Sequence, residues 1–170
     1  SAARRPLRCS RDSSIDAPRV HLIGLVSDGG VHSSDRHLRA LIELAAEWGI
    51  EDVVLHAFTD GRDTDPKAGA RYQAEVESWG ARVATVVGRY FAMDRDQRWD
   101  RTEKALDLLV KGEAGHHADT AEQAAKDAYE RGETDEFIEP TTVGEECVIR
   151  PEDSVVAFNF RPARMRQRTE

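Results

Sequence analysis

Four short polar segments contain most of the side chains in this chain that could do chemistry, and each follows an apolar run. They hold arginines, aspartates and one histidine, residue types that bind anions and exchange protons near neutral pH. Because loops at the ends of regular elements commonly carry function, the pattern predicts a pocket for a small anion. The four segments are Ser27–His32, Asp60–Asp63, Gly88–Asp96 and Asn159–Arg164.

The first two segments combine tight turns with groups that can contact an anion. Gly29 and Gly30 permit close approach of the backbone, and His32 comes just before an expected helix, whose first N–H groups can bind an anion. Arg62 can fork onto a carboxylate or phosphate, and Asp63 can accept a proton from a hydroxyl group. Taken alone, either segment is also explained by an ordinary turn with local ion pairs.

The last two segments supply arginines beside apolar residues. Arg89 and Arg95 alternate with aromatic residues and a methionine, a platform that suits a desolvated anion. Arg161 and Arg164 flank Pro162, which favours the first turn of a helix. In such a helix both guanidinium groups would point the same way, toward a phosphate. Nearby aspartates are expected to be structural partners of the third segment's arginines: Asp94, Asp96 and Asp100.

His116 and His117 form an adjacent pair that raises the question of a metal site. No third ligand follows at a metal-binding spacing, so both are expected to be exposed histidines in a loop between helices. His21, His37 and His56 are expected to be scaffold residues. The chain also lacks a P-loop, a dinucleotide glycine fingerprint, a nucleophile elbow and a zinc motif. We therefore assign no metal ligands to it.

Length and composition limit the classes of protein to consider. A chain of 170 residues suits one domain, and none of its apolar runs reaches the roughly 18 residues of a membrane span. A net charge of -8 argues against a general nucleic-acid binder. The basic N-terminus lacks the apolar region of a secretory signal, although its composition partly fits an organellar transit peptide. With two cysteines, the expected location is the reducing cytoplasm.

Strands and helices are expected to alternate, which predicts an α/β domain with a mostly parallel sheet and helices on both faces. We expect residues 1–19 to form an irregular tail and residues 20–170 to form the domain. Ligands of such sheets bind beyond the carboxyl ends of the strands, where all four polar segments fall. The expected strands are Val20–Val26, Asp52–Phe58, Arg82–Val87 and Ser154–Phe160, and the expected helices are Asp35–Trp48, Ala68–Trp79, Trp99–Lys111 and Thr120–Tyr129.

Five motifs, in this order, resemble the cofactor-independent phosphoglycerate mutase family. The resemblance covers about residues 20–166 and corresponds to the family's substrate-binding (phosphoglycerate transferase) domain alone. It implies a glycolytic isomerase that interconverts 3-phosphoglycerate and 2-phosphoglycerate without 2,3-bisphosphoglycerate. It also implies two manganese ions and a phosphorylated serine on a separate phosphatase domain. The motifs are Ser27–His32, His56–Asp63, Gly88–Arg101, Glu139–Thr141 and Phe158–Arg164.

The resemblance also implies which residues bind phosphoglycerate. Arg62, Arg89 and Arg95 would orient the carboxylate and hydroxyls of glycerate, and Asp63 would be catalytic, serving the proton transfers. Arg161 and Arg164 would steady the phosphoryl group. The full implied substrate-binding set is His32, Arg62, Asp63, Arg89, Arg95, Arg161 and Arg164.

Two departures from the family pattern stand inside the motifs, Phe91 for a common tyrosine and Ala163 for a usual aspartate. The family's serine nucleophile and metal ligands have no counterpart in these residues, so the chain alone is expected to be inactive. Two further hypotheses stay open: a stand-alone module that binds phosphoglycerate or a similar anion, and an inactive remnant. The expected partners are therefore 2- or 3-phosphoglycerate and a metal-bearing phosphatase domain.

Overall fold

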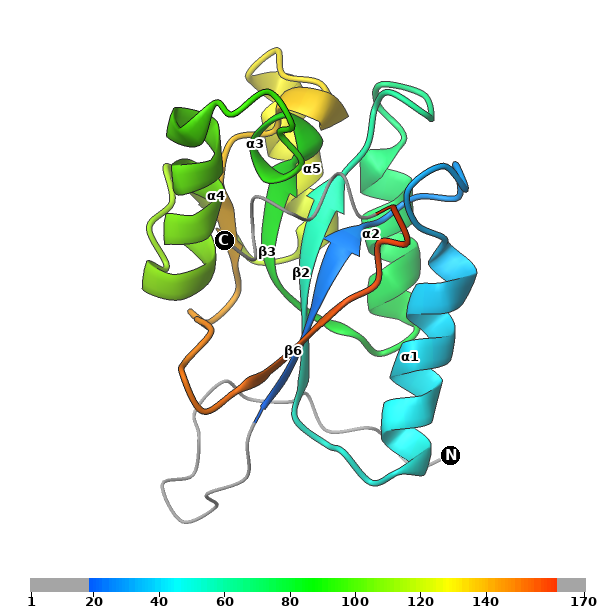
Figure 1. Ribbon diagram of the computed structural model, residues 1–170. Coiled ribbons are helices and arrows are strands. Elements are labelled where there is room, and N and C mark those ends of the chain that lie inside the picture. The colour runs from blue at the N-terminus through cyan, green and yellow to red at the C-terminus, as the bar shows by residue number, and fades with distance from the viewer. Residues whose placement is uncertain (1–18, 162–170) are drawn as a thin grey trace.

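The computed structural model describes residues 19–161, which fold around one six-stranded sheet of order β4-β5-β3-β2-β1-β6 (Figure 1). Every strand pair is parallel except β3 with β5, so the prediction of a mostly parallel sheet is confirmed. The strands are β1 (Val20–Leu25), β2 (Val53–Thr59), β3 (Arg82–Gly88), β4 (His116–Ala118), β5 (Thr141–Val143) and β6 (Ser154–Ala157). The helices are α1 (Asp35–Glu47), α2 (Gly69–Ser78), α3 (Arg89–Ala92), α4 (Trp99–Lys111), α5 (Ala121–Glu130) and the 3-10 helix η1 (Asp135–Phe137).

Helices cover both faces of the sheet, as predicted. On one face α1, α2 and α5 pack their apolar stripes into a core that includes Leu38, Val76 and Ala124. On the other face α3 and α4 pack against the sheet through Phe91 and Leu108. Since Phe91 is buried there, its side chain contributes to the core.

The longer predicted elements are observed within one or two residues of their expected bounds, apart from the last strand. Thr120 caps α5 by accepting a hydrogen bond from the Gln123 N–H at 3.1 Å, as the capping-box pattern predicts. The last strand was predicted to reach Phe160 but ends at Ala157. There the Asn159 side chain accepts a hydrogen bond from the Leu25 N–H at 2.9 Å, which holds the departing chain against β1.

The segment around η1 fits closely over the ends of β2 and β3. The Gly88 N–H donates to the Ile138 carbonyl at 2.8 Å, and a Cβ atom at Gly88 would lie only 2.4 Å from the Glu136 carbonyl oxygen. Gly61 has a φ of 65°, and a Cβ there would lie 2.7 Å from the Glu136 nitrogen. Only glycine therefore fits at these two positions, one in the turn after β2 and one at the end of β3.

The predicted tail falls almost wholly outside the described residues, as do Pro162, Ala163 and Arg164. Arg19 is described and is buried, with its Nε donating to Asp52 at 2.8 Å. Within residues 19–161, the helices are all too short or too polar to cross a membrane.

Candidate active site

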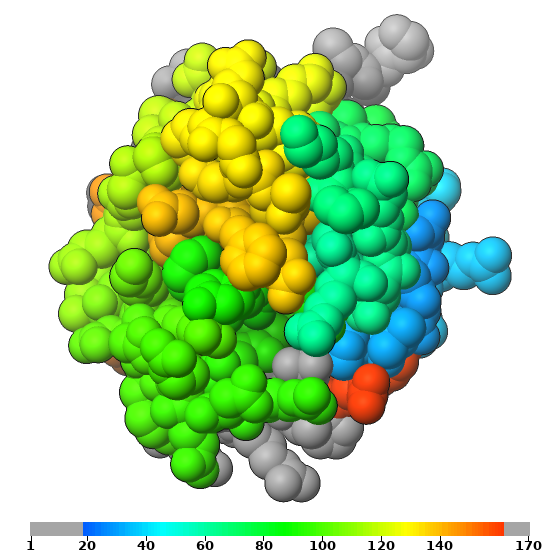
Figure 2. All heavy atoms as spheres, turned by 90° about the horizontal axis from the view of Figure 1, so that it is seen from above, coloured from blue at the N-terminus to red at the C-terminus, as the bar shows by residue number. Residues whose placement is uncertain are grey.

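The ends of four parallel strands bring the predicted site segments together at one edge of the sheet. β1, β2, β3 and β6 all point toward the top of Figure 1, and the segments that follow them carry His32, Arg62, Asp63, Arg89 and Arg161. Figure 2 looks onto this edge, where the segments after β1 (blue), β2 (blue-green), β3 (green) and β6 (red) lie around one region. The predicted grouping of the four segments is thus found in the fold.

A buried ion cluster forms the centre of this edge. The Arg89 Nη1 atom donates to Asp60 Oδ1 at 2.6 Å and to Asp63 Oδ2 at 2.7 Å. The side chains of Arg89 and Asp60 are 3% and 1% exposed, whereas that of Asp63 is 20% exposed. One guanidinium therefore joins a fully buried carboxylate to one that reaches the surface.

Histidine and serine complete the cluster from the β1 side. His32 Nε2 lies 3.5 Å from Asp63 Oδ2, and the His32 ring is buried. Ser27 donates its hydroxyl proton to Asp60 Oδ2 at 2.7 Å. The Phe160 N–H donates to the His32 carbonyl at 2.9 Å, so the chain beyond β6 also contacts this segment.

Hydrogen bonds hold the central groups in their charged forms. Burial alone would raise the pKa of Asp60, but hydrogen bonds from the Asp63 backbone, Ser27 and Arg89 lower it overall. Burial alone would lower the pKa of Arg89, but Asp63 and Asp60 raise it overall. Asp60 and Arg89 therefore form a buried pair of opposite charges at neutral pH.

The other predicted arginines lie outside this buried cluster. Arg62 is 59% exposed, and its Nη1 is 3.6 Å from Glu136 Oε1. Arg95, in the segment between α3 and α4, and Arg161, after β6, are both exposed. Arg164 lies outside the described residues. Of the predicted set, the structure thus brings His32, Asp63 and Arg89 into direct contact and leaves Arg62, Arg95 and Arg161 exposed to solvent.

The partners expected for the third segment's arginines are correct only in part. Arg101 pairs with Asp94 at 3.4 Å, and Arg98 with Asp100 at 3.2 Å. Arg89 instead reaches across to the segment after β2, because the start of α3 turns its side chain inward.

Asp60 and Ser27 are the site residues that the sequence did not single out. Each is the polar residue that closely follows an apolar strand, and Asp60 begins the Asp-Gly-Arg-Asp motif. A small polar residue buried at the carboxyl end of a parallel strand was the available signal.

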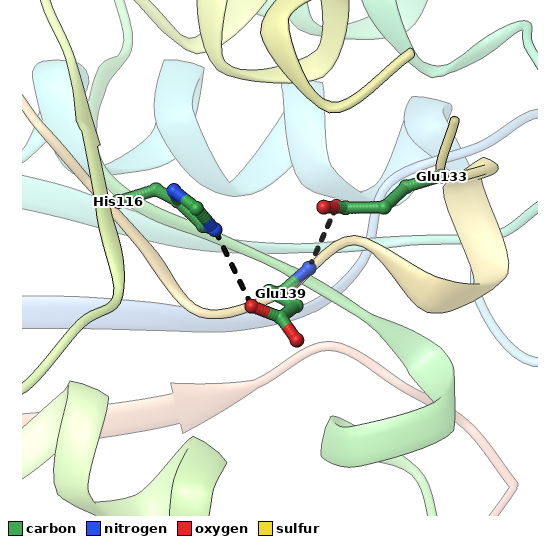
Figure 3. A group of neighbouring side chains, drawn as sticks. All are labelled: His116, Glu133 and Glu139. Atoms are coloured by element: carbon green, nitrogen blue, oxygen red, sulfur yellow. Dashed lines mark hydrogen bonds and ion pairs between the residues drawn. The ribbon is translucent and has the colours of Figure 1, made fainter. Parts of the chain in front are cut away.

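His116 belongs to a group of possible metal ligands beside the starts of β4 and β5, drawn in Figure 3. The expectation of a loop is wrong, because His116 and His117 lie in β4. Ligand atoms of His116, Glu133 and Glu139 all lie within 4.8 Å of one another. However, the Arg131 guanidinium binds both Glu133 oxygens, at 2.7 and 3.2 Å. That ion pair already neutralises Glu133, so the cluster supports no metal assignment.

A cavity of about 330 Å³ lies beside α4, also away from the cluster. Its walls include Lys104, Asp107 and Glu139, and none of the predicted site residues lines it. The cavity and the buried ion cluster thus lie at different places. We assign the site to the cluster, because the predicted side chains converge there.

Comparison with known proteins identifies the family. The sequence family described as "BPG-independent PGAM N-terminus" matches residues 7–170. A 2,3-bisphosphoglycerate-independent phosphoglycerate mutase of Haloarcula marismortui is 59% identical over 89% of this chain, and one of Natronomonas pharaonis is 56% identical over 88%.

A solved structure shows the same fold. A phosphoglycerate mutase of Leishmania mexicana, studied at low cobalt concentration, superposes with a TM-score of 0.80 at 32% identity over 87% of this chain. The chain spans 30% of the length of each of these three relatives. This chain therefore belongs to the BPG-independent phosphoglycerate mutase N-terminal family, as the five motifs predicted.

Proposed function

We propose that this chain forms the side of a phosphoglycerate mutase active site that holds and orients the phosphoglycerate. A separate, metal-bearing phosphatase domain would form the other side and carry the phosphorylated serine. The observation that supports this most directly is the Asp60–Arg89–Asp63 cluster with His32, in segments at the carboxyl edge that also carry exposed arginines. Its relatives are named 2,3-bisphosphoglycerate-independent, so we expect no requirement for 2,3-bisphosphoglycerate.

Asp63 is the residue placed to move protons in this proposal. Its Oδ2 contacts Arg89 and His32, while part of the side chain stays exposed. The carboxylate would take the proton of a glycerate hydroxyl as that oxygen accepts the phosphoryl group from the serine. It would return a proton to the oxygen that gives its phosphoryl group away. Arg89 and His32 orient Asp63, and the exposed arginines hold the carboxylate and phosphate of the ligand.

The two manganese ions implied by the family do not fit this edge. Both aspartates of the cluster bind Arg89, and neutralising them with a metal would leave the buried guanidinium unpaired. We therefore assign the metal ions to the phosphatase domain. On this chain, catalysis consists of binding, orientation and proton transfer.

Arg161→Ala tests the assignment of the exposed arginines. A guanidinium bound to phosphate contributes about 1.5–3 kcal/mol, so the affinity for 3-phosphoglycerate should fall at least about tenfold. Isothermal titration calorimetry measures this directly. Arg150→Ala removes another exposed arginine, just before β6 at the opposite edge of the sheet, and should leave the affinity unchanged. Equal affinity of Arg161→Ala and the unsubstituted chain would argue against the assignment.

Reconstitution tests the proposal as a whole. The chain, a separately made phosphatase domain, manganese and 3-phosphoglycerate are mixed, and 2-phosphoglycerate is measured. We expect product only when both proteins are present. Binding of 3-phosphoglycerate without turnover in any such mixture would favour the stand-alone binding module. Absence of both would favour the inactive remnant.

A further inference from the structure

Asp60 accepts several hydrogen bonds at this edge, yet its side chain is 1% exposed and is not placed to touch a ligand. Its Oδ1 accepts hydrogen bonds from Arg89 Nη1 at 2.6 Å, from the Asp63 N–H at 3.0 Å and from the Arg62 N–H at 3.2 Å. Its Oδ2 accepts from the Ser27 hydroxyl at 2.7 Å. A carboxylate offers about four acceptor sites, so these four donors use its capacity.

These contacts connect the ends of three strands. Ser27 follows β1, Asp60 follows β2, and Arg89 follows β3. The Ser27 oxygen lies 3.4 Å from the Gly29 N–H, which extends the connection into the first polar segment. The buried Asp60 carboxylate thus binds both Ser27 and Arg89, which are 33 and 29 residues away from it along the chain.

The geometry of Arg89 depends directly on this carboxylate. A guanidinium is planar, and its Nη1 atom carries two hydrogens. One of them points to Asp60 and the other to Asp63, so the two carboxylates together fix the plane of the group. Asp60 is the inner, fully buried partner, and Asp63 is the outer one.

We propose that Asp60 is the positioning residue of the site, whose negative charge sets the Arg89 guanidinium and the Arg62–Asp63 backbone in the arrangement that binds phosphoglycerate. This inference rests on the proposed function and deepens it, since it assigns a role to a residue that does not touch the ligand. Without the charge, Arg89 keeps only Asp63 as a charged partner. The proton-transfer carboxylate is then drawn inward with the guanidinium.

The Asp60→Asn substitution removes the negative charge of the side chain and keeps its shape. The amide keeps the volume, its oxygen can still accept from the Arg62 and Asp63 N–H groups, and its NH₂ can face Ser27. We expect the affinity of the chain for 3-phosphoglycerate to fall about 10- to 100-fold, the range for losing a charge-assisted hydrogen bond. The NMR signal of the Arg89 Nε–H group should move, because its guanidinium has lost a charged partner.

Two further variants keep the test decisive if Asp60→Asn is unstable. Ser27→Ala removes one hydrogen bond to Asp60 and leaves the charge, so the affinity should fall severalfold. Asp153→Asn changes another buried aspartate, which accepts the Arg150 N–H at 2.9 Å and lies 3.2 Å from His21 at the opposite edge of the sheet. It should lower stability and leave the affinity within about twofold.

The outcomes separate this inference from the proposed function. If the unsubstituted chain neither binds 3-phosphoglycerate nor supports turnover with the phosphatase domain, the proposed function is overturned. If it binds and Asp60→Asn binds equally well, the role of Asp60 is overturned and the proposed function stands. An unchanged Ser27→Ala affinity, or a lower Asp60→Asn affinity with an unmoved Arg89 signal, would also overturn the positioning role.

Discussion

Replacing Arg89 by methionine is expected to lower the free energy of unfolding by about 3–5 kcal/mol, because it leaves the buried Asp60 charge without its cation. Asp60 is 1% exposed, so water cannot take over the lost contact. The same change should abolish binding of 3-phosphoglycerate, since Asp63 loses its 2.7 Å partner. Urea denaturation followed by circular dichroism measures the first effect and calorimetry the second.

Arg39→Met is the matched control for this change. Arg39 also pairs with a carboxylate, Glu43, at 3.0 Å, but both side chains are more than half exposed. Surface pairs of this kind contribute about 0–1 kcal/mol, so unfolding and binding should be nearly unchanged. A loss below about 1 kcal/mol in Arg89→Met would contradict a tightly coupled buried cluster at the edge.

Acidification is expected to destabilise the fold through His56. Burial, with smaller contributions from His21 and Arg19, lowers the pKa of His56 from 6.5 to about 3. The unfolded chain therefore binds a proton below pH 6.5 that the folded chain excludes. The stability that the neutral ring provides is complete above pH 6.5 and is lost at about 1.4 kcal/mol per pH unit as the pH falls toward 3.

The hydrogen bonds around His56 explain why the folded state excludes that proton. His21 Nε2 lies 3.2 Å from Asp153 Oδ2 and must donate to it, so His21 Nδ1 accepts from His56 Nε2 at 2.8 Å. His56 Nδ1 then accepts from the Thr85 hydroxyl at 2.9 Å. When the His21 and His56 rings are both neutral, each of these three hydrogen bonds has one donor proton and one acceptor. Protonating His56 would point its Nδ1–H at the Thr85 hydroxyl, which would have to give up its donation.

His56→Gln and Asp135→Asn should change the pH dependence with opposite signs. The stability advantage of the unsubstituted chain over His56→Gln should shrink as the pH falls below 6.5. Burial raises the pKa of Asp135 from 3.8 to about 6, so the folded state gains a proton first on acidification, and this group adds stability at low pH. The free energy of unfolding of Asp135→Asn should therefore fall more steeply between pH 6 and 4 than that of the unsubstituted chain. If the free energies of unfolding of the unsubstituted chain and of His56→Gln change with pH in parallel, the role of His56 in acid destabilisation is contradicted.

The sequence predicts the elements with sustained periodicity and the edge where they place their polar segments. β1, β2 and β3 are continuous apolar runs, and α1 and α5 have caps and stripes that local residue types specify. Since parallel strands end at one edge, the grouping of His32, Asp63 and Arg89 follows from that pattern.

The missing parts depend on contacts between distant segments. β4, β5 and α3 are three or four residues long, too short for any period to show. The inward turn of Arg89 depends on Asp60, 29 residues earlier in the chain, and no local pattern specifies that pairing. For the same reason the sequence does not distinguish Asp60 from a solvated loop aspartate.

An NMR titration of the ¹⁵N-labelled chain with 3-phosphoglycerate tests the central claim most directly. The account predicts saturable shifts in the backbone amides of residues 27–32, 60–63, 89–95 and 159–161, the segments that follow β1, β2, β3 and β6. It also predicts no shifts around Glu113 and Pro140, which line the cavity beside α4. Shifts confined to that cavity, or no saturable shifts at all, would contradict the assignment of the carboxyl edge as the phosphoglycerate site.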